Sequence, residues 1–105
     1  MGAKSRRKGY RIEHELVELH RAAGIEARRV PLSGGVEGWE GDLRIQSAAL
    51  GELRAEVKAR AGGEGFKVLE RWLGDGDLLF LRRDRSAPLV VMGWCFYTRM
   101  MMGGK

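Results

Sequence analysis

The sequence predicts an α/β domain in which a mixed central β-sheet of about five strands is flanked by helices. Three observations support this class. Two segments carry apolar residues at helical spacing, five short segments have strand-like patterns, and glycine or proline separates them. These elements follow in the order helix, three strands, helix and two strands. At 105 residues the chain has the commonest size of a domain, so we expect a basic N-terminal arm at 1–8 and one domain at 9–105.

The two expected helices are amphipathic. The first spans 9–23 and ends at Gly24, and its apolar positions are Ile12, Leu16, Leu19 and Ala23. The second spans 65–74 and ends at Gly74, with Phe66, Leu69 and Leu73 on one side. A last segment, 93–102, is expected to pack on the core as a helix or a strand.

The expected strands are short. They are 25–30, which Pro31 closes, then 42–45, 53–59, 77–83 and 89–92. The fourth is apolar without alternation, as in a strand buried on both faces, and the fifth is its expected hairpin partner. Residues 32–41 hold four of the 16 glycines and predict a loop.

The third strand contains the segment RAEVKAR at 54–60, in which charged and apolar residues alternate. Side chains alternate between the two faces of a strand. One face would therefore carry Glu52, Arg54, Glu56, Lys58 and Arg60, and the other Leu53, Ala55, Val57, Ala59 and Ala61. This pattern predicts a half-buried strand whose charged face is either solvated or a site.

The composition is that of a soluble globular protein, with 44% apolar and 31% charged residues. No apolar run approaches the roughly 20 residues of a membrane span, and the N-terminal residues lack the apolar stretch of a signal peptide. The lone Cys95 cannot form an internal disulfide, which suits a reducing compartment, and its apolar neighbours predict a buried thiol. We therefore expect an intracellular, cytoplasmic protein of cellular or phage origin without a membrane partner.

The net charge of +5 is concentrated near the N-terminus. Five basic residues precede the first acidic residue, Glu13, and they are Lys4, Arg6, Arg7, Lys8 and Arg11. Such an arm is typical of proteins that bind an anionic partner, most often nucleic acid, but a solvated terminus explains it equally well.

Two carboxylates are expected to meet at one end of the second and third strands. Asp42 begins the second strand, and a hairpin would bring it beside Glu56. Neighbouring carboxylates repel unless a cation lies between them, and their hard oxygen ligands suit Mg²⁺, with Mn²⁺ as a substitute. Lys58 on the same face would orient or deprotonate an attacking water and offset charge on a phosphate. These parts indicate a metal-dependent phosphodiesterase site.

The order of these residues resembles that of the archaeal-type Holliday junction resolvases, a branch of the PD-(D/E)xK nuclease superfamily. The matching positions are Lys8-Gly9 before Glu13, Arg29 before Ser33, Asp42-Leu43, and Glu56-Val57-Lys58. The resemblance spans residues 4–92. It departs from the family pattern at His14, where an Arg is common, and in a longer loop from Ser33 to Asp42.

The resemblance implies a restriction-endonuclease-like fold and a Mg²⁺-dependent, homodimeric endonuclease that nicks opposing strands of a four-way DNA junction symmetrically. By that likeness Asp42 and Glu56 bind metal, and Glu13 adds a further carboxylate. Ser33 contributes near the scissile phosphate, and Lys58 supports the attacking water. The basic residues expected to contact DNA are Lys4, Arg6, Arg7, Lys8, Arg11, Arg29, Arg60 and Lys67.

Alternatives remain for each of these residues. Glu13 is equally a solvated helix residue, Asp42 a turn cap, and Glu56 with Lys58 an exposed charge ladder. The protein is then either a nuclease for other branched or nicked DNA, or a non-catalytic DNA-binding architectural protein. His14 and His20 are expected on the surface. Trp39 would stack on DNA, pack on a partner or fold onto the core, and Trp72 and Trp94 are expected in the core or an interface. The apolar residues of 65–74 and 78–82 are the expected dimer interface.

Overall fold

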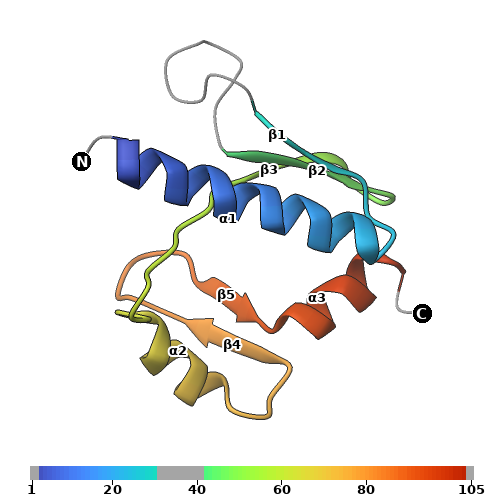
Figure 1. Cartoon of the computed structure of the whole chain (residues 1–105). Helices are drawn as coiled ribbons and strands as arrows, with labels where there is room; N and C mark the ends of the chain where they lie inside the picture. Colours follow the sequence, from blue (N-terminus) through green and yellow to red (C-terminus); the bar gives the residue numbers. More distant parts are fainter. Residues whose placement is uncertain (1–2, 31–41, 104–105) are drawn as a thin grey trace.

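A computed structural model describes residues 3–30 and 42–103, with side-chain positions given from Tyr10 onward (Figure 1). The α/β class and the predicted order of elements are confirmed. The elements are α1 (Ala3–Ala22), β1 (Ala27–Arg29), β2 (Leu43–Ser47), β3 (Gly51–Ala55), α2 (Phe66–Leu73), β4 (Leu78–Leu81), β5 (Leu89–Met92) and α3 (Trp94–Met101). The first helix starts earlier than predicted, so the backbone of residues 3–8 is helical and continuous with the rest of α1.

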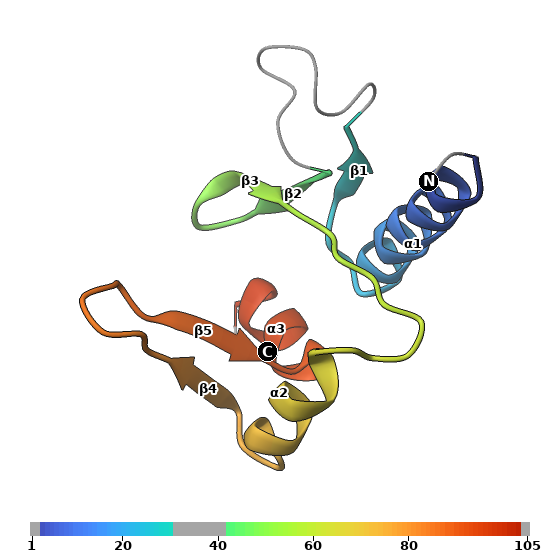
Figure 2. The same cartoon turned by 90° about the vertical axis from the view of Figure 1, so that its left-hand side faces the viewer.

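The five strands of the described segments form two antiparallel sheets. One sheet has the order β1-β2-β3, and the other is the β4-β5 hairpin. The prediction of one mixed five-stranded sheet is therefore wrong for these segments. After β3 the chain leaves the first sheet (Figure 2). β4 and β5 pair with each other and form the second sheet, and α2 packs against both of them. A five-stranded core of the restriction-endonuclease type is therefore not confirmed.

The core lies between α1 and one face of the three-stranded sheet (Figure 1). Five buried residues form it, namely Val17, Ile25, Ala27, Leu43 and Ile45, and Met101 of α3 packs against them. Ala27 is paired with Ile45 and Ile45 with Leu53, so one inward row crosses all three strands. This burial is the main source of stability for the sheet, because an antiparallel sheet needs one covered face.

The inward face of α1 differs from the prediction by one position. Leu19 was expected to face the core, but it is 43% exposed. The buried residues of the helix are Val17 and His20, and Leu16 is half-buried beside them. The positions 16, 17 and 20 lie on one helical face, whereas residue 19 is turned away from it.

His20 was expected on the surface, but it is 4% exposed. Its Nδ1 lies 2.7 Å from the Leu16 carbonyl oxygen, which can only accept, so Nδ1 carries the proton. With the proton on Nδ1, Nε2 accepts from the Tyr97 hydroxyl at 2.8 Å. Burial raises the pKa of the Tyr97 phenol, which keeps the hydroxyl protonated and able to donate. His14, in contrast, is exposed as predicted.

The histidine forms an aromatic cluster that joins the last helix to the first. The ring centroid of His20 lies 4.9 Å from that of Trp94 and 5.5 Å from that of Tyr97, both in edge-on geometry. Such pairs add stability beyond the area they bury. The cluster explains why the 93–102 segment closes the fold as a helix, which the apolar run alone left open.

Other residues of the C-terminal half are more exposed than predicted. Cys95 is exposed and not a buried thiol. The strand at 78–81 is not buried on both faces, since Leu78 and Phe80 on one of its faces are 42% and 64% exposed. Trp72 is 58% exposed, which removes it from the core and leaves the interface alternative, whereas Trp94 is 38% exposed and lies against the ring of buried His20.

We predict that Tyr97→Phe lowers the free energy of unfolding by about 1–2 kcal/mol, because Nε2 of buried His20 loses its hydrogen-bond donor. Urea denaturation followed by circular dichroism measures the change. Tyr10→Phe is the matched control and should change stability by less than about 0.5 kcal/mol, because Tyr10 is exposed and keeps its ring. Equal stabilities of the two variants would contradict the role given to the His20–Tyr97 bond.

Candidate functional site

Asp42 is held at the point where the three strands of the first sheet begin or end. Its backbone N–H donates to the Ala55 carbonyl at 2.8 Å, and its carbonyl accepts from the Val30 N–H at 3.0 Å. Its side-chain Oδ2 accepts from the Val57 N–H at 2.7 Å. The carboxylate is therefore fixed by the backbone beside β3, with one oxygen engaged.

The hairpin brings Asp42 and Glu56 to the same end of the sheet, as predicted. Leu43 is paired with Ala55, so Asp42 and Glu56 are the next residues on their two chains. Glu56 and Lys58 are both exposed, whereas Ala55 and Val57 are half-buried. The alternation predicted from the sequence is confirmed from residue 53 to residue 60.

The third strand ends earlier than predicted. It was expected to reach residue 59, but β3 ends at Ala55. Ala55 is paired with Leu43, the first residue of β2, so no residue of β2 is left to pair with those that follow Ala55. The Asp42 carboxylate takes over by accepting the Val57 N–H. Ala61, expected on the apolar face, is exposed.

Glu13 reaches the sheet from α1 and pairs with a residue that the sequence analysis also selected. Arg29 Nε lies 2.9 Å from Glu13 Oε1, and the side chains are 33% and 16% exposed. The Arg29 guanidinium also lies over the Tyr10 ring, 4.0 Å from its centroid. Glu13 is therefore not a solvated helix residue. An ion pair and a cation–π contact together fix Arg29 against the helix.

The three predicted metal ligands are not gathered into one cluster. No group of three or more His, Cys, Asp or Glu side chains that could hold a metal ion occurs within 3–30 and 42–103. Asp42 and Glu56 are brought together by the hairpin, whereas Glu13 is engaged by Arg29. Ser33 and Trp39 lie outside the described residues.

The basic residues predicted to bind DNA are distributed over several elements. Lys4, Arg6, Arg7 and Lys8 lie along the first turns of α1, and Arg11 follows them as an exposed residue. Arg60 and Lys67 are exposed on the segment that leads into α2 and on α2 itself. Arg29 is paired with Glu13, so this predicted DNA contact already has an acidic partner.

The sequence analysis did not find a group of charged residues on the outer face of the sheet. Arg28, Arg44 and Arg54 lie opposite one another on the three strands, and Glu52 contacts the first two. The alternating pattern placed Arg54 and Glu52 on one face. The pattern of a single strand does not give the register, that is, which residues of neighbouring strands lie opposite one another.

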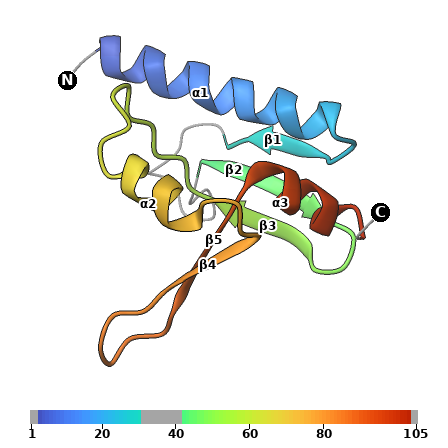
Figure 3. The ribbon, with the colours of Figure 1, turned by 90° about the horizontal axis from the view of Figure 1, so that it is seen from below.

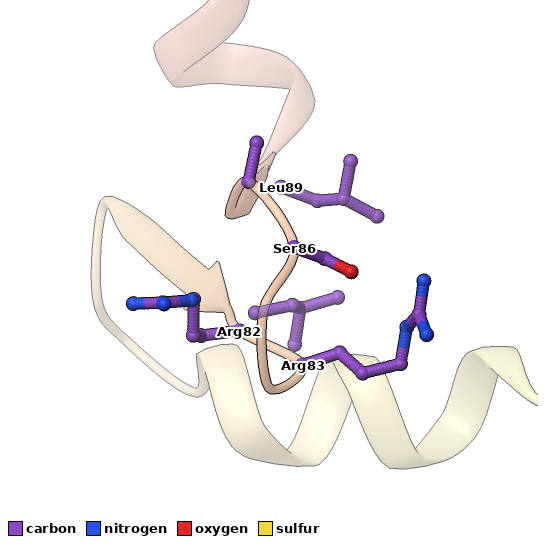
Figure 4. A pocket seen from close by; sticks show the side chains of 6 residues that line it. Arg82, Arg83, Ser86 and Leu89 are labelled. Atoms are coloured by element: carbon purple, nitrogen blue, oxygen red, sulfur yellow. The ribbon is translucent and has the colours of Figure 1, made fainter.

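A hollow lies in the β4-β5 sheet, at the connection between the two strands (Figure 4). It has a volume of about 460 Å³ and is lined by Leu81, Arg82, Arg83, Ser86, Ala87 and Leu89. The loop projects away from the first sheet when the molecule is viewed from below (Figure 3). This hollow is built by the hairpin alone and does not include Asp42 or Glu56.

Comparisons with protein-family models, curated proteins and solved structures found no match. Of the helices in the described part of the chain, none is long and apolar enough to cross a membrane.

We predict that Asp42→Ala lowers the free energy of unfolding by about 1–2 kcal/mol, because the Val57 N–H loses a charged acceptor. Asp42→Asn keeps a side-chain oxygen at the same place and should lose less than half as much. Chemical denaturation measures both. If the two variants unfold at the same denaturant concentration, the hydrogen bond contributes nothing that the carbonyl of Asn can replace.

Proposed function

We propose that the protein is a Mg²⁺-dependent endonuclease that resolves four-way DNA junctions as a homodimer. The observation that carries the proposal is the pairing of Leu43 with Ala55, which sets Asp42 and Glu56 side by side with Lys58 two residues further on. Carboxylate, carboxylate and lysine at one exposed end of a sheet are the parts that phosphodiester hydrolysis needs. The resemblance to junction resolvases in the order of these residues adds the substrate class.

The donor set of this pair fits Mg²⁺. This ion is commonly held by one or two carboxylates, and waters or substrate phosphates complete an octahedral shell. Asp42 has one oxygen bound to the Val57 N–H, which leaves its other oxygen for a cation. Glu56 is exposed and can turn towards the same point. Asp42 and Glu56 are therefore the residues that would hold the metal, and Glu13 would join only by leaving Arg29.

The proposed roles follow from the chemistry of each side chain. A bound divalent cation would polarise the scissile phosphate and lower the pKa of a water molecule in its shell. Lys58, as an ammonium on the same face as Glu56, would orient that water and offset charge that develops on the phosphate oxygens. Ser33 is proposed as a further contact near the scissile phosphate.

Affinity for DNA would come from the basic residues. Their contacts to phosphates give binding that depends on salt and hardly on sequence. A junction-selective nuclease requires this kind of binding, because it must recognise a branch and not a base sequence. The first turns of α1, which carry four of the basic residues of the arm, would then follow the backbone of one DNA arm.

A homodimer is proposed because cutting two opposing strands of a two-fold symmetric junction requires two sites. The β4-β5 hairpin is the surface that fits a second copy. Its strands, LLFL and LVVM, contain no charged residue, and Phe80 and Leu89 are 64% and 67% exposed. A two-stranded hairpin is marginal alone, and an uncharged surface lets two positively charged copies meet without repulsion between them.

We predict that the wild-type protein makes paired, symmetric nicks in an end-labelled synthetic four-way junction with Mg²⁺, and none with a chelator. Glu56→Gln should reduce the rate by at least about 100-fold, on the scale of removing one group that stabilises a transition state. Gel analysis of the labelled strands measures both. Glu70→Gln, an exposed carboxylate on α2, is the matched control and should keep the wild-type rate.

The substrate controls separate the alternatives. Equal cutting of flaps, nicked duplex and junction would keep the nuclease but remove the junction from its description. Binding without cutting under Mg²⁺ or Mn²⁺ would exclude the enzyme.

We also predict that Phe80→Glu converts a dimer into a monomer in sedimentation velocity experiments, because it puts like charges into the apolar contact. Leu50→Glu is the control, since Leu50 is 76% exposed on the turn between β2 and β3 and lies on the other sheet. A wild-type protein that sediments as a monomer at all concentrations would remove the homodimer from the proposal.

A non-catalytic DNA-binding architectural protein is the second candidate. One observation favours it. Glu13, the third proposed metal ligand, is already paired with Arg29. Such a protein would bind DNA better when Asp42 or Glu56 is neutralised, because each carboxylate repels phosphates. A nuclease would instead lose cutting in the same variants, so one pair of variants separates the two functions.

A further inference from the structure

The connection between β4 and β5, residues 82–88, is rich in arginine. It contains Arg82, Arg83 and Arg85, and Asp84 is its one acidic residue. All four of these residues are exposed. The connection projects away from the first sheet (Figure 3), so its excess of positive charge lies apart from the charged residues of that sheet. We call residues 82–88 the arginine loop.

The charges of the arginine loop are not neutralised by the described part of the protein. Within residues 3–30 and 42–103, the guanidinium groups of the three arginines form no ion pair and no hydrogen bond. Arg28 and Arg29 of β1, in contrast, each have a carboxylate partner. Three like charges within four residues repel one another, and Asp84 offsets only one of them. An external anion at the loop would therefore be stabilised.

The backbone of the arginine loop contains a strained residue. The Ser86 N–H donates to the Arg83 carbonyl at 3.1 Å, which closes a reverse turn over Asp84 and Arg85. Arg85 has a φ of 61°, and it alone among the non-glycine residues of the described segments has a positive φ. Glycine adopts this conformation without cost, whereas an arginine there lowers stability. Strain of this kind is concentrated at functional sites, which suggests a use for the Arg85 side chain.

The hollow of about 460 Å³ at this loop has an apolar part and a cationic part. The apolar residues are Leu81, Ala87 and Leu89, and the polar ones are Arg82, Arg83 and Ser86. Figure 4 shows that the side chains of Arg82 and Arg83 extend to opposite sides, with the Ser86 hydroxyl on the side of Arg83. No carboxylate and no aromatic ring is among the residues that line the hollow.

We propose that the arginine loop and its hollow bind the sugar–phosphate backbone of nucleic acid, at a place separate from the pair proposed as the metal site. A nucleic-acid backbone alternates apolar sugar faces with phosphates. The sugars would pack on Leu81 and Leu89, and the phosphates would contact the arginines, whose guanidinium groups favour bidentate contacts with phosphate. Because Arg82 and Arg83 extend to opposite sides, they would contact different phosphates.

The geometry of the loop favours this partner over two others. A flat layer of anionic lipid headgroups would meet only one of the two sides to which Arg82 and Arg83 extend, whereas a backbone lying in the hollow meets both. An unpaired base usually stacks on an aromatic side chain, and none lines this hollow. The backbone of a duplex is therefore the ligand that matches both the charge and the lining.

Binding at the hollow is compatible with the dimer surface proposed above. Leu81 is paired with Leu89, and Phe80 with Val90. Because neighbouring residues of a strand alternate between its faces, Phe80 projects from the face opposite the two leucines. A second copy could thus cover Phe80 while the hollow holds nucleic acid, and a dimer would present two arginine loops to a junction. This last step rests on the proposed function, whereas binding of the backbone by one loop does not.

The test is DNA binding without cleavage. Fluorescence anisotropy with a labelled duplex, in chelator and over a series of salt concentrations, gives the affinity and the slope of log K against log[salt]. The double variant R82Q/R83Q should reduce the magnitude of the slope by about 1.8, because two phosphate contacts are lost at about 0.9 each. The double variant R71Q/R99Q removes the same charge from exposed positions on α2 and α3 and should stay within about 0.5 of the wild-type slope.

Two single variants exclude loss of structure as the cause. Arg85→Gly should reduce the slope by about 0.9 without lowering the urea midpoint, because glycine adopts a positive φ without strain. Asp84→Asn removes the one carboxylate of the loop and should raise the affinity for DNA by about twofold. A misfolded variant cannot bind more tightly, so this gain would report on the charge of the loop alone.

The remaining outcomes decide between partners. Slopes that stay within about 0.5 of wild type for both R82Q/R83Q and Arg85→Gly would overturn the proposal. It would also be overturned if these variants lost binding to vesicles that contain anionic lipid but kept their binding to DNA, since the loop would then belong to a membrane surface.

The same variants separate the arginine loop from the nuclease. If the wild-type protein cuts no DNA but the loop variants lose affinity and salt dependence, the nuclease is wrong and the loop proposal stands. If the wild-type protein cuts junctions while the loop variants bind with the wild-type slope, the nuclease stands and the loop proposal is wrong.

Discussion

The structure depends on the antiparallel register of β1, β2 and β3. This register puts Ala27, Ile45 and Leu53 on the face that α1 covers, and it puts Arg28, Arg44, Glu52 and Arg54 on the other. A slip by one residue would bury arginines and expose the core, so hydrophobic burial fixes the register strongly. The positions of Asp42 and Glu56, and of Arg28, Arg44 and Arg54 on the outer face, are consequences of that one constraint.

Asp42 is the point where folding and the proposed chemistry meet. The sheet ends there, and its carboxylate, not a backbone carbonyl, accepts the Val57 N–H. A carboxylate held in this way loses little conformational freedom when it binds a ligand, since the fold has already ordered it. Stability and the proposed function therefore depend on the same side chain. Only a substitution that keeps a hydrogen-bond acceptor for the Val57 N–H can separate the two effects.

The local patterns of the sequence predicted much of this fold. Alternation in 53–60 gave the inward and outward residues correctly, and the turn from Gly74 and the hairpin partner of β4 were found as well. The wrong predictions concern long-range pairing. Nothing in the segment LLFL says whether it joins the first sheet or pairs with β5. In sequence, an apolar strand with one exposed face also looks the same as a strand buried on both faces.

His20 and Glu13 show the same limit for single side chains. Both are polar residues on an amphipathic helix, and their partners Tyr97 and Arg29 are 77 and 16 residues away. A buried histidine requires a partner for each ring nitrogen, and only the folded chain shows that both exist. The pair Asp42 and Glu56 was found because a hairpin brings its members together locally, whereas the row of Arg28, Arg44 and Arg54 needs the register of two strand pairs.

Several arginines of the first sheet have acidic partners, and these carboxylates would have to give way to phosphates if the chain, with its 14 acidic residues, bound a polyanion. Arg29 is held by Glu13, and Arg28 by Glu52, in ion pairs near the surface. The Arg28–Glu52 pair, with both side chains 49% exposed, contributes only about 0–1 kcal/mol, because water screens it. Replacing Glu52 there by a phosphate would therefore cost little, while the released counterions of the nucleic acid would favour the exchange. The Arg29–Glu13 pair is less exposed and less screened by water, so in a complex Glu52 would leave its arginine at a smaller cost than Glu13.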